Sequence, residues 1–216
     1  MTTPAPGTAN NSTHNNFGTM AVVCFAYSVF ALLLLHLLRR DYVPRDHMVS
    51  DYGVGPYSWV MNSCFLGLAG GFLALFLGLL RHGPRSVVGR IGTFLLIIPA
   101  IGVVVSAIFP VDLLGAPDTP TGEIHNISFF VNVVVIMLSS VLVSFSFGSD
   151  SRWSSYRRTA LVLASFIVVA FVIQFRTLHR GMPYGYANRL FLIALFGWFF
   201  CTASRLRSVT RDSARG

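Results

Sequence analysis

The sequence predicts an all-α membrane protein, folded as a bundle of six transmembrane helices, and three observations support this class. Hydrophobic residues make up 54% of the 216 residues and charged residues only 11%, whereas a soluble domain usually carries about 25% charged residues. The hydrophobic residues fall in six runs of about the length that crosses a bilayer. The sixteen basic residues, all of them arginines, are clustered between these runs, as topology signals are. We therefore expect a lipid bilayer around the protein and no nucleic-acid partner, in spite of the net charge of +8.

The first half of the chain supplies three of the predicted spans. Residues 1–19 are rich in Thr, Asn, Ser, Pro and Gly, which predicts a disordered tail. The transmembrane domain follows over residues 20–203, and its first spans are expected at residues 20–38, 59–80 and 91–109. A helix of nineteen residues rises about 28 Å, close to the thickness of the hydrocarbon core. Pro99 lies in the middle of the third span and predicts a kink there.

The second half supplies the other three spans. They are expected at residues 124–147, 159–175 and 184–203, with a basic tail at 204–216. The last hydrophobic run begins only at Leu190 and is too short to cross a membrane, so its helix has to begin near Tyr184. This start places Arg189 more than one turn inside the helix, where a charge must extend to the membrane surface or find an acid. We expect Asp112 to be that acid, with Asp51 as the second candidate.

Two of the spans carry a stripe of similar residues along one side of the helix: polar residues on the fourth span and small residues on the second. Polar residues recur every seven positions on the fourth span and so share one side of the helix: His125, Asn132, Ser139 and Ser146. Such a stripe cannot face lipid cheaply, so we expect it to face other helices. Small residues recur every four positions on the second span, which favours close helix packing: Ser63, Gly67 and Gly71.

The distribution of charges predicts the orientation in the membrane. An even number of spans places both termini on one face, which receives ten arginines against six on the other. The positive-inside rule therefore predicts a multi-pass protein of the cell membrane with both termini in the cytoplasm. The opposite, extracytoplasmic face receives six of the eight acidic residues and three histidines. This predicts a polar cluster of Asp, His and Arg on the extracytoplasmic face.

The residues of this face suggest two kinds of chemistry. Asp112 and His125 lie at neighbouring membrane edges and could act as an acid–base pair, with Ser50 as a candidate nucleophile. The ligand types of a catalytic zinc site, three protein ligands and a water, are also present: His47, His125 and His179, with Asp51 or Asp112. No HExxH, HxxxH or GxSxG motif accompanies them.

Other residues of this half of the protein are candidates for binding. The paired donors of Arg189 match a phosphate or a carboxylate, and the polar stripe could line a path or a pocket. The candidate binding residues are Arg189, Asp51, Asp46, Arg176 and Asn132. The expected ligand is a lipid headgroup, or the face contacts a membrane protein partner.

Three short motifs resemble a known family. They are Ser50-Asp51 followed by Gly55-Pro56, the sequence FPVD followed by TGEIH, and Gly-Tyr-x-x-Arg at the start of the last span. In this order and spacing they resemble the DUF998 family of six-span bacterial membrane proteins over residues 20–203. In outline the family is similar to the more distant Frag1/DRAM/Sfk1 group. The resemblance implies a six-helix bundle and no established reaction.

Three functions stay open at this point. The first hypothesis is an accessory or structural subunit that stabilises a partner in the membrane. The second is a lipid-handling protein or a transporter, although no inverted repeat is evident. The third is an enzyme working at the outer leaflet, either metal-dependent or by acid–base chemistry. Whether the extracytoplasmic histidines and Asp112 converge in space is the observation that separates them best.

Overall fold

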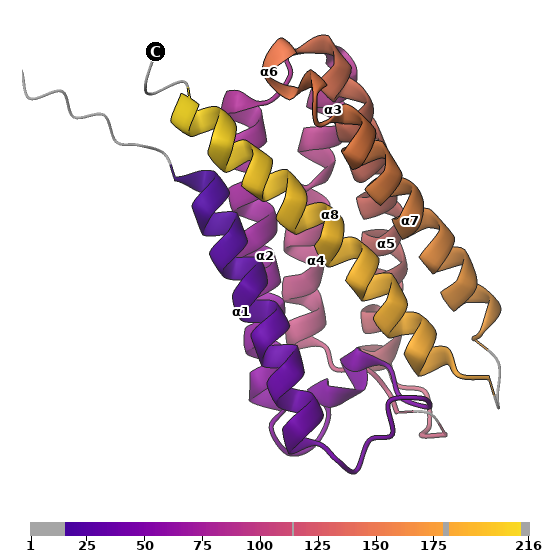
Figure 1. The fold of residues 1–216 in the computed structure, drawn as a ribbon. Helices are drawn as coiled ribbons and strands as arrows, with labels where there is room; N and C mark the ends of the chain where they lie inside the picture. Colours follow the sequence, from indigo (N-terminus) through magenta and orange to yellow (C-terminus); the bar gives the residue numbers. More distant parts are fainter. Residues whose placement is uncertain (1–15, 114, 179–181, 213–216) are drawn as a thin grey trace, which may run out of the picture.

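The computed structural model describes residues 16–113, 115–178 and 182–212, and within these ranges it is helical with no strand (Figure 1). In the same ranges six helical segments are long and apolar enough to cross a membrane. They are α1 (Phe17–Leu38), α2 (Ser58–His82), the pair α3 (Val87–Leu95) and α4 (Ile97–Ile108), α5 (Pro120–Ser146), α7 (Arg157–Arg176) and α8 (Tyr184–Asp212). Three short helices lie in the connections: η1 (Val49–Gly53), η2 (Phe147–Ser149) and α6 (Ser151–Ser154). The predicted six-helix membrane bundle is therefore confirmed.

The spans form a ring in the order of the chain. Each packs against the next, from α1 through α2, α4, α5 and α7 to α8, and α8 closes the ring against α1 (Figure 1). The closure is tight, because a Cβ at Gly18 would lie 2.6 Å from the backbone nitrogen of Arg207. We call the end of the bundle with the start of α1 and the end of α8 the termini end. The opposite end, with residues 39–57, 109–113 and 115–119, is the cap end.

An aromatic cluster fills the ring where α1, α2 and α8 meet. The ring of Phe25 stacks on Phe199 at 5.0 Å, and Phe72 meets both of them edge-on at 5.9 and 5.0 Å. All three side chains are buried. Offset and edge-to-face pairs of this kind add to the burial of their large apolar surfaces. The small-residue stripe of α2 packs against α1, since a Cβ at Gly71 would lie 2.4 Å from the ring of Phe25 on that helix.

The polar stripe of α5 faces other helices, as predicted. His125, Asn132, Ser139 and Ser146 are all buried. The hydroxyl of Ser139 donates to the carbonyl of Gly92 on α3 at 2.7 Å. Such bonds satisfy the hydroxyls in a region without water. The stripe therefore helps to hold α5 against the third span.

The third span is divided where Pro99 predicted a kink. α3 ends at Leu95 and α4 begins at Ile97, with the amide of Leu96 bonded back to the carbonyl of Thr93 at 3.1 Å. Proline has no amide hydrogen, so the carbonyl of Leu95, four residues earlier, receives no bond from position 99. The span therefore consists of two helical pieces that meet at Leu96.

The last helix is longer than expected. α8 continues to Asp212 and so includes most of the residues that the sequence assigned to a basic tail. The reason is that Leu206 and Val209 are buried against the bundle, at 0% and 3% exposure, so an apolar stripe persists among the arginines. At the other terminus α1 already begins at Phe17, and residues 1–15 of the predicted tail lie outside the described residues.

Candidate functional site

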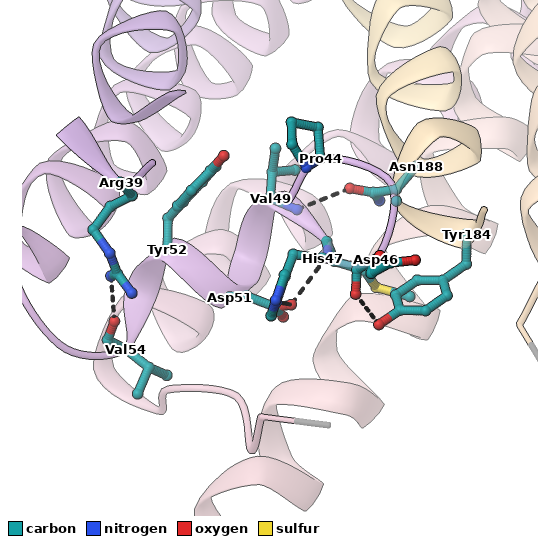
Figure 2. Close-up of polar contacts among 12 residues, drawn as sticks. Arg39, Pro44, Asp46, His47, Val49, Asp51, Tyr52, Val54, Tyr184 and Asn188 are labelled. Atoms are coloured by element: carbon teal, nitrogen blue, oxygen red, sulfur yellow. Dashed lines mark hydrogen bonds and ion pairs between the residues drawn. The ribbon is translucent and has the colours of Figure 1, made fainter. Parts of the chain in front are cut away.

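Residues 39–57, which we call the roof loop, fold over the cap end of the ring. The loop contains η1 and is bonded to the first turns of α8 (Figure 2). The amide of Val49 donates to Asn188 Oδ1 at 3.1 Å. The hydroxyl of Tyr184 donates to the carbonyl of Asp46. These contacts place the loop over the interior of the bundle.

Arg39 holds one side of the roof loop. Its side chain is only 4% exposed. Nη1 donates to the carbonyl of Val54 at 2.7 Å (Figure 2) and to the carbonyl of Pro56 at 3.1 Å. Nη2 forms an ion pair with Asp41 at 2.9 Å, and the guanidinium lies 3.9 Å from the centre of the Tyr42 ring. The hydrogen bonds from Arg39 lower the pKa of the Asp41 carboxyl. Both ends of the loop are thereby fixed to the end of α1.

Arg189 holds the other side of the loop, and its partners differ from those predicted. Nη1 donates to the carbonyls of Pro44, His47 and Gly185 at 2.8–3.0 Å, Nη2 to the Tyr52 hydroxyl at 3.3 Å, and Nε to His36 Nε2 at 2.9 Å. Within the described ranges no acid forms an ion pair with Arg189. The expected pairing with Asp112 or Asp51 is therefore wrong.

The close approach of the roof loop to α8 explains this choice of partners. A Cβ at Gly185 would lie 2.3–2.9 Å from the carbonyl oxygens of Pro44, His47 and Arg45, so the loop backbone rests directly on the helix. Its carbonyls are already beside Arg189 and satisfy the guanidinium. Asp112 instead accepts from the amide and hydroxyl of Thr119 at 2.7 and 2.9 Å. It thereby orients the N-cap residue of α5.

A buried acid lies in the middle of the roof loop. Asp51 is 7% exposed and accepts from His47 Nδ1 and from the amide of Met48, both at 3.1 Å (Figure 2). The imidazole of His47 is stacked on Tyr42 with 4.3 Å between ring centres. Burial raises the pKa of the Asp51 carboxyl, and the bond from His47 offsets this only in part.

Directly beneath the roof loop lies a cavity of about 110 Å³. It is lined by the roof loop and by α1, α2, α4, α5 and α8, with mostly aromatic and aliphatic side chains. The polar residues in its wall are Ser50, Ser106, His125, Asn132 and Asn188. The side chain of His125 is held by a bond from Nδ1 to the carbonyl of Phe109 at 2.8 Å. An apolar cavity with a few fixed polar groups is the usual form of a small-ligand site.

The structure gathers only some of the predicted site residues. Ser50, His125 and Asn132 line the cavity together, and Asp51, His47 and Arg189 lie in or under its roof. The others lie apart: the Asp46 carboxylate is half exposed beside Arg45, Arg176 is exposed at the end of α7, and Asp112 is at the start of α5. Asp112 and His125 are thus engaged with different partners.

The zinc hypothesis stays a prediction. His179 lies outside the described residues. Among the residues that the structure does describe, no three His, Cys, Asp or Glu side chains are grouped to hold a metal ion. The Nδ1 atoms of His47 and His125 are bonded to Asp51 and to a backbone carbonyl.

Three residues of the site were not identified from the sequence. Arg39 reads as a simple stop signal after the first span, yet it is buried and bonded to the roof loop. His36 reads as an interfacial histidine, yet it accepts from Arg189. Asn188 carried no signal except its place beside Arg189. Polar residues directly next to a span boundary are therefore the feature of the sequence that could identify them.

Fold and site together define a multi-pass membrane protein whose six spans enclose an apolar cavity beneath a fixed loop. The family model described as "Protein of unknown function (DUF998)" matches residues 8–205. The chain therefore belongs to the DUF998 family. No curated protein and no solved structure matches it.

Proposed function

We propose that this protein binds a membrane lipid and holds part of its apolar chain in the cavity beneath the roof loop. The cavity carries the proposal. Its wall is almost entirely apolar, with residues such as Phe65, Phe129 and Phe196. Apolar cavities of about 150 Å³ stay dry and bind benzene-sized molecules. A cavity of about 110 Å³ therefore suits a short stretch of acyl or isoprenoid chain and is too small for a headgroup.

The depth of the cavity supports a ligand from one leaflet. It reaches from Ser50 in the roof loop to Ile136, about the middle of α5, and so occupies the cap-end half of the bundle. The ten-to-six division of arginines favours this end as the extracytoplasmic one. The lipid would then belong to the outer leaflet of the cell membrane.

The other hypotheses have less support. An accessory role calls for a partner surface, and the apolar outer sides of the spans fit lipid as well as protein. An enzyme is favoured by one observation, that Ser50 and His125 line the same cavity. In the described residues no hydrogen bond joins them, and His125 Nδ1 is bonded to the carbonyl of Phe109. Both hypotheses stay predictions.

Photolabelling with a phospholipid that carries a diazirine at mid-chain tests the proposal. In membranes, the wild-type protein should form adducts on cavity residues such as Phe129 and Phe196 as well as on the lipid-facing surface. Val133→Phe fills the cavity, since Val133 is buried in its wall, and should remove the cavity adducts. Val134→Phe is the matched control, because Val134 is 46% exposed on the outside of the same helix.

Two outcomes would overturn the proposal. One is a wild-type protein labelled only on its lipid-facing surface. The other is a Val133→Phe variant that keeps its cavity adducts at the wild-type level. If Val133→Phe does not fold, Ser106→Leu replaces it, because Ser106 lines the same cavity from α4 and a leucine there would occupy the space.

A further inference from the structure

A second apolar hollow lies on the outside of the ring, between α4 and α5. This groove has a volume of about 340 Å³. Ile101 and Ile127 on its rim are 60% and 56% exposed, which in a transmembrane segment means exposure to lipid. The groove is therefore open to the hydrocarbon chains of the bilayer at all times.

Asn132 lines both this groove and the internal cavity. Its amide is buried, at 6% exposure, and so stands between the two spaces. The residue opposite on α4 is Gly102, which has no side chain to thicken the wall. A Cβ there would lie 2.0 Å from Asn132 Oδ1. Of the residues that line the two spaces, Asn132 is the one that they have in common.

The Asn132 amide is held weakly. The hydroxyl of Ser128 donates to the carbonyl of Gly102 at 2.9 Å, so its oxygen can only accept from the Asn132 NH2 group, at a long 3.5 Å. The NH2 group of the amide therefore faces Ser128. Its oxygen, Oδ1, has no donor in the described part of the chain. A buried acceptor without a partner is unfavourable, so little is lost when the side chain turns away.

The roof, by contrast, is held firmly. Arg189 makes three hydrogen bonds to the roof loop and one to α1, and Arg39 fixes the near end of the loop by an ion pair with Asp41 and the far end by two carbonyl bonds. Hydrogen bonds from charged donors are about twice as strong as neutral ones. Opening the roof would break several of these bonds together, whereas opening the wall breaks one weak bond.

From this contrast we infer that the α4–α5 groove is the entrance of the lipid chain, which passes sideways from the bilayer into the cavity as the Asn132 side chain turns aside. The inference rests on the proposed lipid binding. Asn132 is thus a gate in the wall of the site.

The test follows exchange of the same diazirine lipid. Protein in detergent is loaded with the labelled lipid, an excess of unlabelled lipid is added, and samples are illuminated at intervals to measure the loss of cavity adducts. Val131→Trp obstructs the groove, because Val131 lines the groove and not the cavity. We expect exchange to slow at least tenfold while the equilibrium occupancy stays the same. Asn132→Ala should accelerate it, and Val134→Trp should leave it unchanged.

Two results would overturn the inference. In one, Val131→Trp exchanges at the wild-type rate. In the other, Asn188→Ala, which removes a bond of the roof loop, accelerates exchange more than Asn132→Ala does, so that the chain enters through the roof. Both presuppose cavity adducts in the wild-type protein. Failure of lipid binding itself is thereby distinguished, since it would leave no cavity adducts to exchange.

Discussion

Arg189 and His36 join α8 to α1 at the edge of the membrane, with 2.9 Å between Nε and Nε2. His36 Nδ1 donates to the carbonyl of Leu32 at 2.7 Å, so its Nε2 is free to accept from the arginine. The same guanidinium bonds the backbone of the roof loop. One charged side chain therefore connects α8 to α1 and both helices to the roof loop above the cavity.

Arg189→Ala should lower the free energy of unfolding by about 1.5–3 kcal/mol, the range for hydrogen bonds to a charged group, because it removes the donor shared by the roof loop and α1. Arg189→Lys should also be destabilising, because one ammonium group cannot reach partners in three directions. Arg176→Ala is the control, since Arg176 is exposed at the end of α7, and it should lose little. Thermal unfolding in detergent measures all three.

Double-mutant cycles separate the real partner of Arg189 from the one that the sequence suggested. The losses from Arg189→Ala and His36→Ala should be non-additive, because the two side chains are in contact. The losses from Arg189→Ala and Asp112→Ala should add, because Asp112 is bonded to Thr119. Additive losses in the His36 cycle would contradict the structure at this contact.

The pH dependence of stability should report the buried Asp51. Burial raises the pKa of its carboxyl in the folded state, so the ionised form is less favourable there than in the unfolded chain. The stability contributed by Asp51 is therefore greatest below its unfolded pKa of about 4. It falls as pH rises through the folded pKa and is constant above it.

Asp51→Asn removes this titration and keeps an acceptor for the amide of Met48. The stability of the wild type relative to Asp51→Asn should therefore increase as the pH is lowered from 7 towards 4. Chemical unfolding at a series of pH values measures the difference. A relative loss of wild-type stability over this range would mean that the bond from His47 outweighs burial.

The orientation of the bundle can be checked by labelling single cysteines in a variant without Cys24, Cys64 and Cys201. Thr119 lies at the cap end and Ser151 at the termini end, and both are exposed. We expect a membrane-impermeant maleimide, added to whole cells, to label a cysteine at 119 and not one at 151. The reverse pattern would place the cavity in the cytoplasmic leaflet.

The sequence predicts the spans of this protein well and its site poorly, for a physical reason. Long apolar runs and a seven-residue polar period are local signals, so six spans and the burial of Asn132 follow from them. Partner choice is not local. Arg189 prefers carbonyls because Gly185 lets a distant loop rest on its helix, and no spacing in the sequence expresses that contact.

The cavity illustrates the same limit. Its wall draws on the roof loop and five spans, so its existence depends on how the ring closes. The motif pairing of Ser50 with Asp51 marked the loop, but only the fold brings Ser50 and His125 to one space. Asp112, which looked equivalent in the sequence, lies outside because Thr119 bonds both of its oxygens.

The close contact between Gly102 and Asn132 predicts that a larger residue at position 102 is destabilising. A methyl group at position 102 would lie 2.0 Å from Asn132 Oδ1 and 2.5 Å from Nδ2, so Gly102→Ala must displace the amide. Because the weakly held amide can turn aside, we expect the low end of the usual cost of overpacking, about 1 kcal/mol, which thermal unfolding should show as a lowered midpoint. Gly197→Ala on α8 is the control, because the nearest atom to its Cβ is 3.8 Å away, and it should be neutral or slightly stabilising.

Asn132→Ala in the same chain should restore the stability that Gly102→Ala removes, because it takes away the group with which the new methyl collides. The double variant should then be more stable than Gly102→Ala alone, a coupling that two independent sites would not have. If the second substitution only adds to the loss, the strain lies in the α4 backbone and the amide is not what fills the space beside Gly102.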